Sequence, residues 1–208
     1  MAENVLIYGK SGSGKSRSLI NFKEDEIVLF NTIGKRLPFQ KKFKYNQKVD
    51  NYNLIKATLT KMPQKVAIID DATYLLVNDF MENHSKHHTG GEQFQMYNDL
   101  ADSFFKLMKF SRENIPEDVV VYYLMQEETT DNGDIKPRTI GKLLDSKVIL
   151  EGLITVSLRC VVKNEKHIFL TQSDGFDVSK SPEGMFPDLE IPNDLKAVDT
   201  AIRKYWGL

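Results

Sequence analysis

Residues 9–16 read GKSGSGKS and follow a short apolar run at residues 5–8. This is the GxxxxGK[ST] spacing of a phosphate-binding loop (P-loop), in which glycines let backbone N–H groups turn inward around phosphate oxygens. A helix that begins at the end of the loop adds the favourable end of its dipole. The pattern therefore predicts a site for the phosphates of ATP or GTP, together with Mg²⁺.

Two residues of this loop have specific expected roles. Lys15 is expected to reach the β- and γ-phosphates, and Ser16 to coordinate Mg²⁺. An ordinary Gly/Ser turn is the alternative, but the position between a predicted strand and a predicted helix favours the P-loop. The other residues expected to bind the nucleotide are Gly9, Lys10, Ser11, Gly12, Ser13, Gly14 and Arg17.

A second chemical feature is the pair of acids that ends the run VAIIDD at residues 66–71. Asp70 is predicted to hold the metal, directly or through water. An ordinary helix-capping aspartate is the alternative. Asp71 is a candidate for orienting the attacking water, and capping of the helix that begins near Ala72 explains it equally well.

Gln126 directly follows an apolar run at residues 119–125, which predicts that its amide lies at the carboxyl edge of the sheet, where ligands bind in open α/β folds. It is a candidate γ-phosphate sensor or, alternatively, a solvent-facing loop residue. Glu127 is a candidate water-orienting carboxylate, although adjacent like charges in a loop are usually only solvated. The candidate catalytic residues are therefore Lys15, Asp70, Asp71, Gln126 and Glu127.

Two basic segments are candidates for nucleic-acid contact. Residues 35–48 mix lysines and an arginine with Phe39, Phe43 and Tyr45, a composition that suits phosphate contact and base stacking on single strands, with a solvated face as the alternative. Residues 133–147 carry cations that could reach either DNA or the γ-phosphate bound by a neighbouring subunit. The candidates from both segments are Lys35, Arg36, Lys136, Arg138 and Lys142.

Alternating strands and helices must position these residues. The sequence predicts a mostly parallel sheet with helices on both faces, and an antiparallel hairpin formed by residues 153–162 and 166–171. Strands are predicted over residues 5–8, 27–30, 66–69 and 119–125. Helices are predicted over residues 15–22, 50–62, 74–80, 92–112 and 194–206.

Composition limits the remaining possibilities. The 208 residues are 41% hydrophobic and 27% charged, which suits one α/β domain over residues 1–208. A net charge of −1 excludes an overall basic surface for nucleic acid. Without an apolar run of about 20 residues or a basic leader, we expect no membrane contact and a cytoplasmic location. Cys160 is expected to be a buried strand thiol, and His84, His87 and His88 to lie in a polar loop rather than a metal site.

The chain also resembles a family. The motifs are GKSGSGKS, NTIGK at residues 31–35, IIDD at 68–71, DNGDIKPRTIGKLLD at 131–145, TQSDG at 171–175 and SPEGMF at 181–186. Over most of the chain they resemble phage-encoded RecA-like ATPases, an AAA-annotated group that includes Sak-type single-strand annealing proteins. The resemblance implies a RecA-like core that binds ATP and Mg²⁺, with Lys15, Ser16 and Asp70 matching the nucleotide motifs.

The resemblance further implies a homo-oligomeric ring or filament that acts on single-stranded DNA in phage recombination, annealing or replication. It would do so in the host cytoplasm, with a single-strand-binding protein as a partner. The chain departs from the pattern at Asn31, where RecA-like enzymes commonly have a catalytic glutamate. Slow ATP hydrolysis is therefore expected, with Asp71 or Glu127 as substitutes and ATP chiefly controlling assembly.

Three other functions remain open. A partition-type dimeric P-loop ATPase is suggested by Lys10, five residues before Lys15, although Ser11 stands where those proteins usually have glycine. A small nucleotide kinase fits the length, but the chain has only six arginines and no Arg-rich lid. The third is a nucleotide-gated interaction module for a helicase or recombinase.

Overall fold

The computed structural model describes residues 1–86, 89–141 and 143–208, without the side chains of residues 145–147. Nine strands form a mixed, mostly parallel sheet in the order β3-β2-β4-β5-β1-β7-β8-β9, with β6 paired to β5. The parallel strands are β1 (Glu3–Gly9), β2 (Ile27–Asn31), β3 (Tyr45–Lys48), β4 (Val66–Asp70), β5 (Val120–Thr129) and β7 (Val156–Lys163). The antiparallel additions are β6 (Ile135–Pro137), β8 (Lys166–Leu170) and β9 (Glu190–Pro192).

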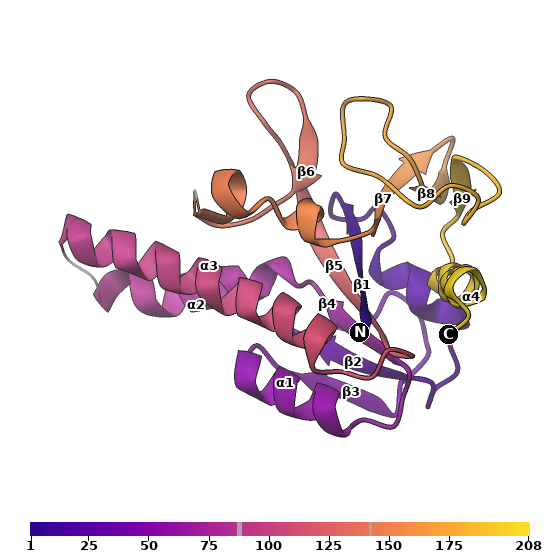
Figure 1. Ribbon diagram of the computed structural model, residues 1–208, viewed down its shortest axis with the longest axis horizontal. Helices are drawn as coiled ribbons and strands as arrows, with labels where there is room; N and C mark the ends of the chain where they lie inside the picture. Colours follow the sequence, from indigo (N-terminus) through magenta and orange to yellow (C-terminus); the bar gives the residue numbers. More distant parts are fainter. Residues whose placement is uncertain (87–88, 142) are drawn as a thin grey trace.

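Helices cover both faces of the sheet, as predicted (Figure 1). One face carries α1 (Tyr52–Lys61), α2 (Thr73–Asn83) and α3 (Gly90–Glu113), and the other carries the short 3₁₀ helix η1 (Ser16–Asn21) and α4 (Leu195–Trp206). Further short helical turns are η2 (His84–Lys86), η3 (Leu143–Val148) and η4 (Leu150–Leu153). None of the helices in the described part of the chain combines the length and the apolar composition that crossing a bilayer requires.

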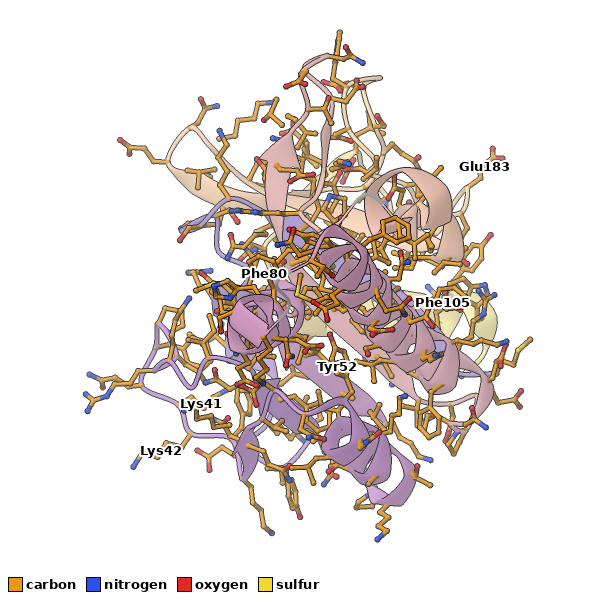
Figure 2. All side chains as sticks on the ribbon, turned by 90° about the vertical axis from the view of Figure 1, so that its left-hand side faces the viewer. Lys41, Lys42, Tyr52, Phe80, Phe105 and Glu183 are labelled. Carbon is orange, nitrogen blue, oxygen red and sulfur yellow. The ribbon has the colours of Figure 1, made fainter. Side chains whose placement is uncertain are left out.

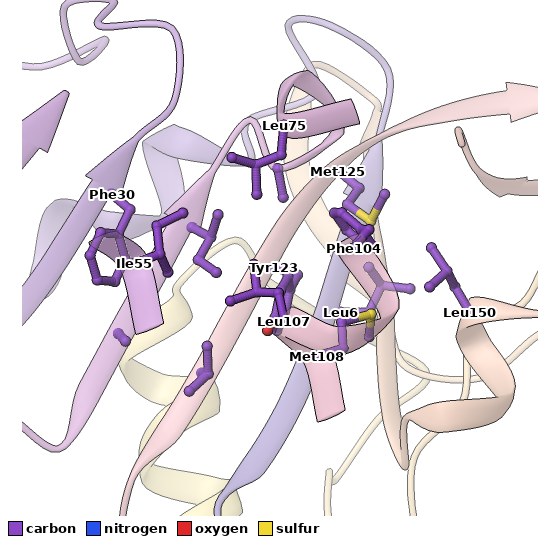
Figure 3. Close-up of a cluster of buried hydrophobic side chains, with 14 of the residues drawn as sticks. Leu6, Phe30, Ile55, Leu75, Phe104, Leu107, Met108, Tyr123, Met125 and Leu150 are labelled. Carbon is purple, nitrogen blue, oxygen red and sulfur yellow. The ribbon is translucent and has the colours of Figure 1, made fainter. Parts of the chain in front are cut away.

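The central strands are buried on both faces, which explains their continuous apolar runs. On β1, Leu6 packs in the cluster under α1–α3, whereas its neighbours Val5 and Ile7 pack in the cluster under η1 and α4. Figure 3 shows the first cluster, where Leu6, Tyr123 and Met125 of the sheet meet Phe104 and other side chains of α3. Burial on both sides fixes the position from which β1 delivers the P-loop.

The helix predicted over residues 15–22 is shorter and of another type. It is η1, and two side chains account for this. The Ser18 hydroxyl donates to the Lys15 carbonyl at 2.6 Å, and the Lys41 amino group bonds the carbonyls of Ile20 and Phe22. The carbonyls of Ile20 and Phe22 are thus satisfied by a side chain rather than by a following helical turn, whereas that of Lys15 also accepts the backbone N–H of Ser18.

The prediction that the fourth strand ends before Gln126 is also wrong, because β5 continues to Thr129 and pairs with β6 through residues 127–129. Strands β3 and β9 were not predicted, since they are short and mostly polar or exposed. The predicted hairpin is confirmed as β7–β8, with Asn164 and Glu165 at positive φ in its turn.

Candidate nucleotide site

The P-loop leaves the sheet from its middle, because β1 lies between β5 and β7. The strand packs so closely that a Cβ atom on Gly9 would lie 2.3 Å from the Cys160 carbonyl oxygen. Gly14 has φ +107°, which side chains rarely adopt, and a Cβ there would lie 2.8 Å from His167 Nδ1. Glycine is therefore required at both ends of this loop, and the loop backbone remains open to a ligand.

Lys15 is folded back over the loop. Its Nζ donates to the carbonyl oxygens of Gly9 at 2.7 Å and Lys10 at 2.9 Å, and lies 3.4 Å from Gln126 Oε1. The side chain is buried, and this desolvation lowers its pKa, while nearby acids including Asp70 and Asp71 oppose the shift. A cation is therefore held in place at the strand end before any ligand arrives.

Ser16 and Asp70 form the expected hydroxyl–carboxylate pair, with Ser16 Oγ donating to Asp70 Oδ1 at 2.9 Å. Asp70 is buried, and burial, with a smaller contribution from the charge of Asp71, raises its pKa to about 6. A bound cation would stabilise the charged form of this carboxylate, which burial disfavours. The described residues hold no cluster of three or more His, Cys, Asp or Glu that could bind a metal.

Asp71 is buried and has φ +57°. Its backbone is held by Thr32, whose hydroxyl lies 3.0 Å from the Asp70 carbonyl oxygen and 2.9 Å from that of Asp71. Its carboxylate accepts hydrogen bonds from Lys35 Nζ at 2.9 Å and Gln126 Nε2 at 3.2 Å. The start of α2 receives no side-chain cap, so the Asp71 carboxylate belongs to the pocket rather than to the helix.

Gln126 connects the P-loop with the acidic residues that follow β4. It pairs in register with Gly9, and its amide contacts both Lys15 and Asp71. The Thr73 hydroxyl accepts from its backbone N–H at 2.9 Å. The side chain is half-buried at the carboxyl end of the parallel strands, as the sequence predicts, although the strand continues beyond it.

Glu127 lies on the opposite side of the P-loop from Asp70 and Asp71, because neighbouring side chains on a strand point to opposite faces. Its carboxylate accepts two hydrogen bonds from Arg159, at 2.9 and 3.2 Å, and Arg159 also pairs with Asp177 at 3.5 Å. With Arg159 it lines a separate cavity that is also bordered by Lys10 and Ser13. The structure therefore does not bring Glu127 to the residues around Asp70.

The candidate pocket has a volume of about 300 Å³. It unites the P-loop with the ends of β4 and β5 and with the loop that follows β2. Gly9 lies behind it, and Lys10 and Ser13 face the cavity beside Glu127. The residues singled out in the sequence that line the pocket are Ser11, Gly12, Gly14, Lys15, Ser16, Arg17, Lys35, Arg36, Asp70, Asp71 and Gln126.

His167 also lines this pocket and was missed in the sequence. Its Nδ1 donates to the Ser13 carbonyl oxygen at 2.7 Å, which orders the P-loop from the side of β8. The buried thiol of Cys160 donates to the same carbonyl at 3.1 Å, and burial raises the pKa of this thiol to about 11. A single histidine in a hairpin strand carries no sequence signal for this role, because the contact depends on β7–β8 packing beside β1.

Asn31 ends β2 opposite Asp70 in the sheet register. Its side chain accepts from the Gly34 N–H at 2.8 Å and donates to the Lys35 carbonyl oxygen at 2.7 Å. The residue at the position where RecA-like enzymes commonly have a glutamate therefore shapes the turn at residues 31–35.

The first basic segment has fewer free aromatic rings than its composition suggests. Phe43 is buried and meets Phe39 edge-on, and Tyr45 packs partly against the core. Lys41 is bound to the end of η1, whereas Lys42 is exposed and points outward in Figure 2. A groove of about 1060 Å³ runs along this segment and shares Lys35, Arg36 and Pro38 with the candidate pocket.

The second basic segment is only partly near the pocket. Lys136 pairs with Glu128 at 3.5 Å on the β5–β6 ribbon. Arg138 is exposed, and its backbone N–H donates to the Gln126 carbonyl oxygen at 2.7 Å, so it lies next to the site. Lys142 falls outside the described residues, as do His87 and His88. His84 stacks on Phe80.

Comparison of the chain with models of known protein families and with curated protein sequences finds no match in either.

Proposed function

We propose that this chain is a Mg²⁺-dependent ATPase that binds ATP at residues 9–16. The observation that carries the proposal is the hydrogen bond between Ser16 and Asp70 beside the buried amino group of Lys15. A hydroxyl that donates to a neighbouring carboxylate lies close enough for both groups to hold one metal ion. The adjacent lysine would supply positive charge for the β- and γ-phosphates. Gly12 and Gly14 line the pocket without side chains, which brings the loop backbone next to the space proposed for the phosphates.

A RecA-like core is part of the proposal. It is supported by the motif resemblance and by a mostly parallel sheet in which β5, carrying Gln126, lies between the P-loop strand β1 and the Asp70 strand β4. In open α/β sheets ligands bind at the carboxyl ends of the strands. Gly9 and Asp70 end β1 and β4, and Gln126, within β5, pairs with Gly9 at the same edge.

For hydrolysis, the geometry favours Asp71 and Gln126 over Glu127. Both contact the network around Lys15, whereas Glu127 is paired with Arg159 in another cavity. Asp71 is itself engaged by Lys35, and Asn31 contributes no carboxylate. We therefore propose that ATP turnover is slow.

We further propose that the ATPase acts on single-stranded DNA in phage recombination, annealing or replication, as a homo-oligomer in the host cytoplasm. The motif resemblance supports this step. A second support is the basic groove of residues 34–48, which joins the nucleotide pocket at Arg36. Phosphate contacts made by such cations weaken as salt rises.

The test is ATPase activity measured with and without single-stranded DNA at low salt. Lys15→Ala and Asp70→Ala are compared with Lys61→Ala, which changes an exposed lysine at the end of α1. We expect Mg²⁺-dependent turnover that DNA stimulates, lost in the first two variants and kept in the third. Turnover in wild type no higher than in Lys15→Ala would refute the ATPase. Turnover without any DNA effect would refute only the DNA step.

A further inference from the structure

Lys35 reaches the candidate pocket from a loop that is not part of the P-loop motif. Its Nζ donates to Asp71 Oδ2 at 2.9 Å, and the lysine side chain is 57% exposed while the aspartate side chain is 10% exposed. Asp71 Oδ1 accepts from Gln126, and Gln126 Oε1 lies 3.4 Å from Lys15 Nζ. A continuous polar chain therefore links the amino groups of Lys15 and Lys35.

The backbone around Lys35 is built to hold this position. Asn31 bonds both the N–H of Gly34 and the carbonyl of Lys35. Gly34 has φ +77°, and a Cβ there would lie 2.9 Å from Lys48 Cδ. Thr32 binds the carbonyl oxygens of Asp70 and Asp71, which fixes the acceptor relative to the same turn. Hydrogen bonds therefore fix the backbone of both Lys35 and Asp71, the two partners of the ion pair.

The charge of the pocket shows what Lys35 is needed for. The described residues that line it include four cations, Lys15, Arg17, Lys35 and Arg36, against the two carboxylates of Asp70 and Asp71. With His167 neutral the formal charge is +2, and a bound Mg²⁺ brings it to +4, which balances the roughly four negative charges of a fully ionised nucleoside triphosphate. Without Lys35 three cations would remain against the two carboxylates, and the formal charge with Mg²⁺ would be +3, one short of that balance.

We propose that Lys35 binds the γ-phosphate of the nucleotide held by its own subunit, and that Asp71 is the positioning residue that keeps the amino group there. This rests on the proposed ATP binding. The γ-phosphate is assigned because Lys15 would reach the β- and γ-phosphates and Ser16 with Asp70 would hold Mg²⁺ beside them. Lys35 is linked to Lys15 through Asp71 and Gln126, so it stands at the end of this polar chain opposite to the loop carbonyls that Lys15 contacts.

Affinities for ADP and for a non-hydrolysable ATP analogue, measured by calorimetry with Mg²⁺, test this assignment. In Lys35→Ala we expect the analogue to bind about 10- to 100-fold more weakly, the value of a charge-assisted hydrogen bond, with ADP affinity nearly unchanged. Lys35→Arg should recover part of the loss, and Lys61→Ala should match wild type.

The outcomes separate the two proposals. If wild type binds neither nucleotide, the proposed function fails. If wild type binds both and Lys35→Ala weakens both equally or neither, ATP binding stands and the γ-phosphate assignment fails. Faster hydrolysis in Lys35→Ala would also overturn it, because Lys35 would then restrain Asp71 rather than hold phosphate.

Asp71 is tested with Asp71→Asn alone and combined with Lys35→Ala. A positioning role predicts weaker analogue binding in the single variant and no further loss of affinity in the double variant. Unchanged analogue affinity in Asp71→Asn would overturn that role.

Mixing the Lys15→Ala and Lys35→Ala variants tests whether Lys35 contacts the nucleotide of its own subunit or that of a neighbour. If Lys35 served a neighbouring subunit, the mixture would regain ATPase activity, because one partner supplies the P-loop and the other the lysine. We expect no recovery, and recovery would refute the assignment to its own subunit.

Discussion

Ser16 and Asp70 lie 54 positions apart in the chain, yet Ser16 Oγ donates a 2.9 Å hydrogen bond to Asp70 Oδ1. They come from elements that are not neighbours in the sheet, since β5 lies between β1 and β4. The P-loop therefore crosses β5 at Gln126, which pairs with Gly9 and contacts Lys15, to reach Asp70.

Stability of the ligand-free protein should fall as pH rises from about 4 to about 6. Asp70 has a folded-state pKa of about 6 against 3.8 for an ordinary aspartate, so the folded state binds more protons between these values. The unfolding free energy then decreases with pH, by on the order of 3 kcal/mol in total, and levels off above pH 6. Urea unfolding at several pH values measures the unfolding free energy and its decrease with pH.

Asp70→Asn is the control for that experiment, because an amide keeps the acceptor for Ser16 and does not titrate. Its stability should lack the decline between pH 4 and 6. Wild-type and variant curves that run parallel would contradict the assignment to Asp70.

Lys15→Met should leave the ligand-free fold intact, because desolvation already disfavours the charged amine at this buried position. Nucleotide should no longer protect the variant against heat. In wild type, ligand at about 100 times its dissociation constant stabilises by roughly 2.7 kcal/mol. A thermal shift in Lys15→Met equal to that of wild type would count against P-loop binding.

Gly14→Ala should destabilise the protein and abolish nucleotide binding, because its Cβ would lie 2.8 Å from His167 Nδ1 at a φ of +107°. Gly12→Ala is the matched variant, with positive φ but no atom within 4 Å of the added Cβ. Both share the backbone cost of about 1–2 kcal/mol, so the excess loss in Gly14→Ala reports the His167 contact. Equal losses by chemical denaturation would argue that this contact is unimportant.

Glu127→Gln should lower stability rather than catalysis. The Glu127 side chain is 3% exposed and Arg159 is 17% exposed, so breaking this pair costs roughly 3 kcal/mol. Glu128→Gln, which weakens a more exposed pair with Lys136, should cost under about 1 kcal/mol.

Urea unfolding and ATPase rates measured well below the melting temperature distinguish the two roles of Glu127. A large fall in kcat at unchanged stability would restore Glu127 as a catalytic residue. Unchanged kcat per folded molecule is the expected result.

Local sequence was sufficient for the central strands, the longer helices and part of the site, but not for the short strands β3, β6 and β9. The apolar runs of β1, β2, β4 and β5 predict buried parallel strands, because strands covered on both faces exclude polar residues. The helices predicted over residues 50–62 and 92–112 are α1 and α3, and the structure shows that Asn51 and Thr89 cap their starts. The P-loop residues are recognisable because their spacing along the chain reflects the loop's own geometry, and Asp70 because it ends a buried apolar run.

Tertiary structure alone decided which polar residues meet. Gln126 and Glu127 are adjacent in sequence, and only the pairing of β5 with β1 determines that Gln126 faces Lys15 while Glu127 faces Arg159. The contacts of Lys35 with Asp71 and of His167 with Ser13 bridge distant segments that carry no local pattern. Sequence spacing fixes side chains within one loop or one element, whereas the order and register of strands fix which elements share an edge.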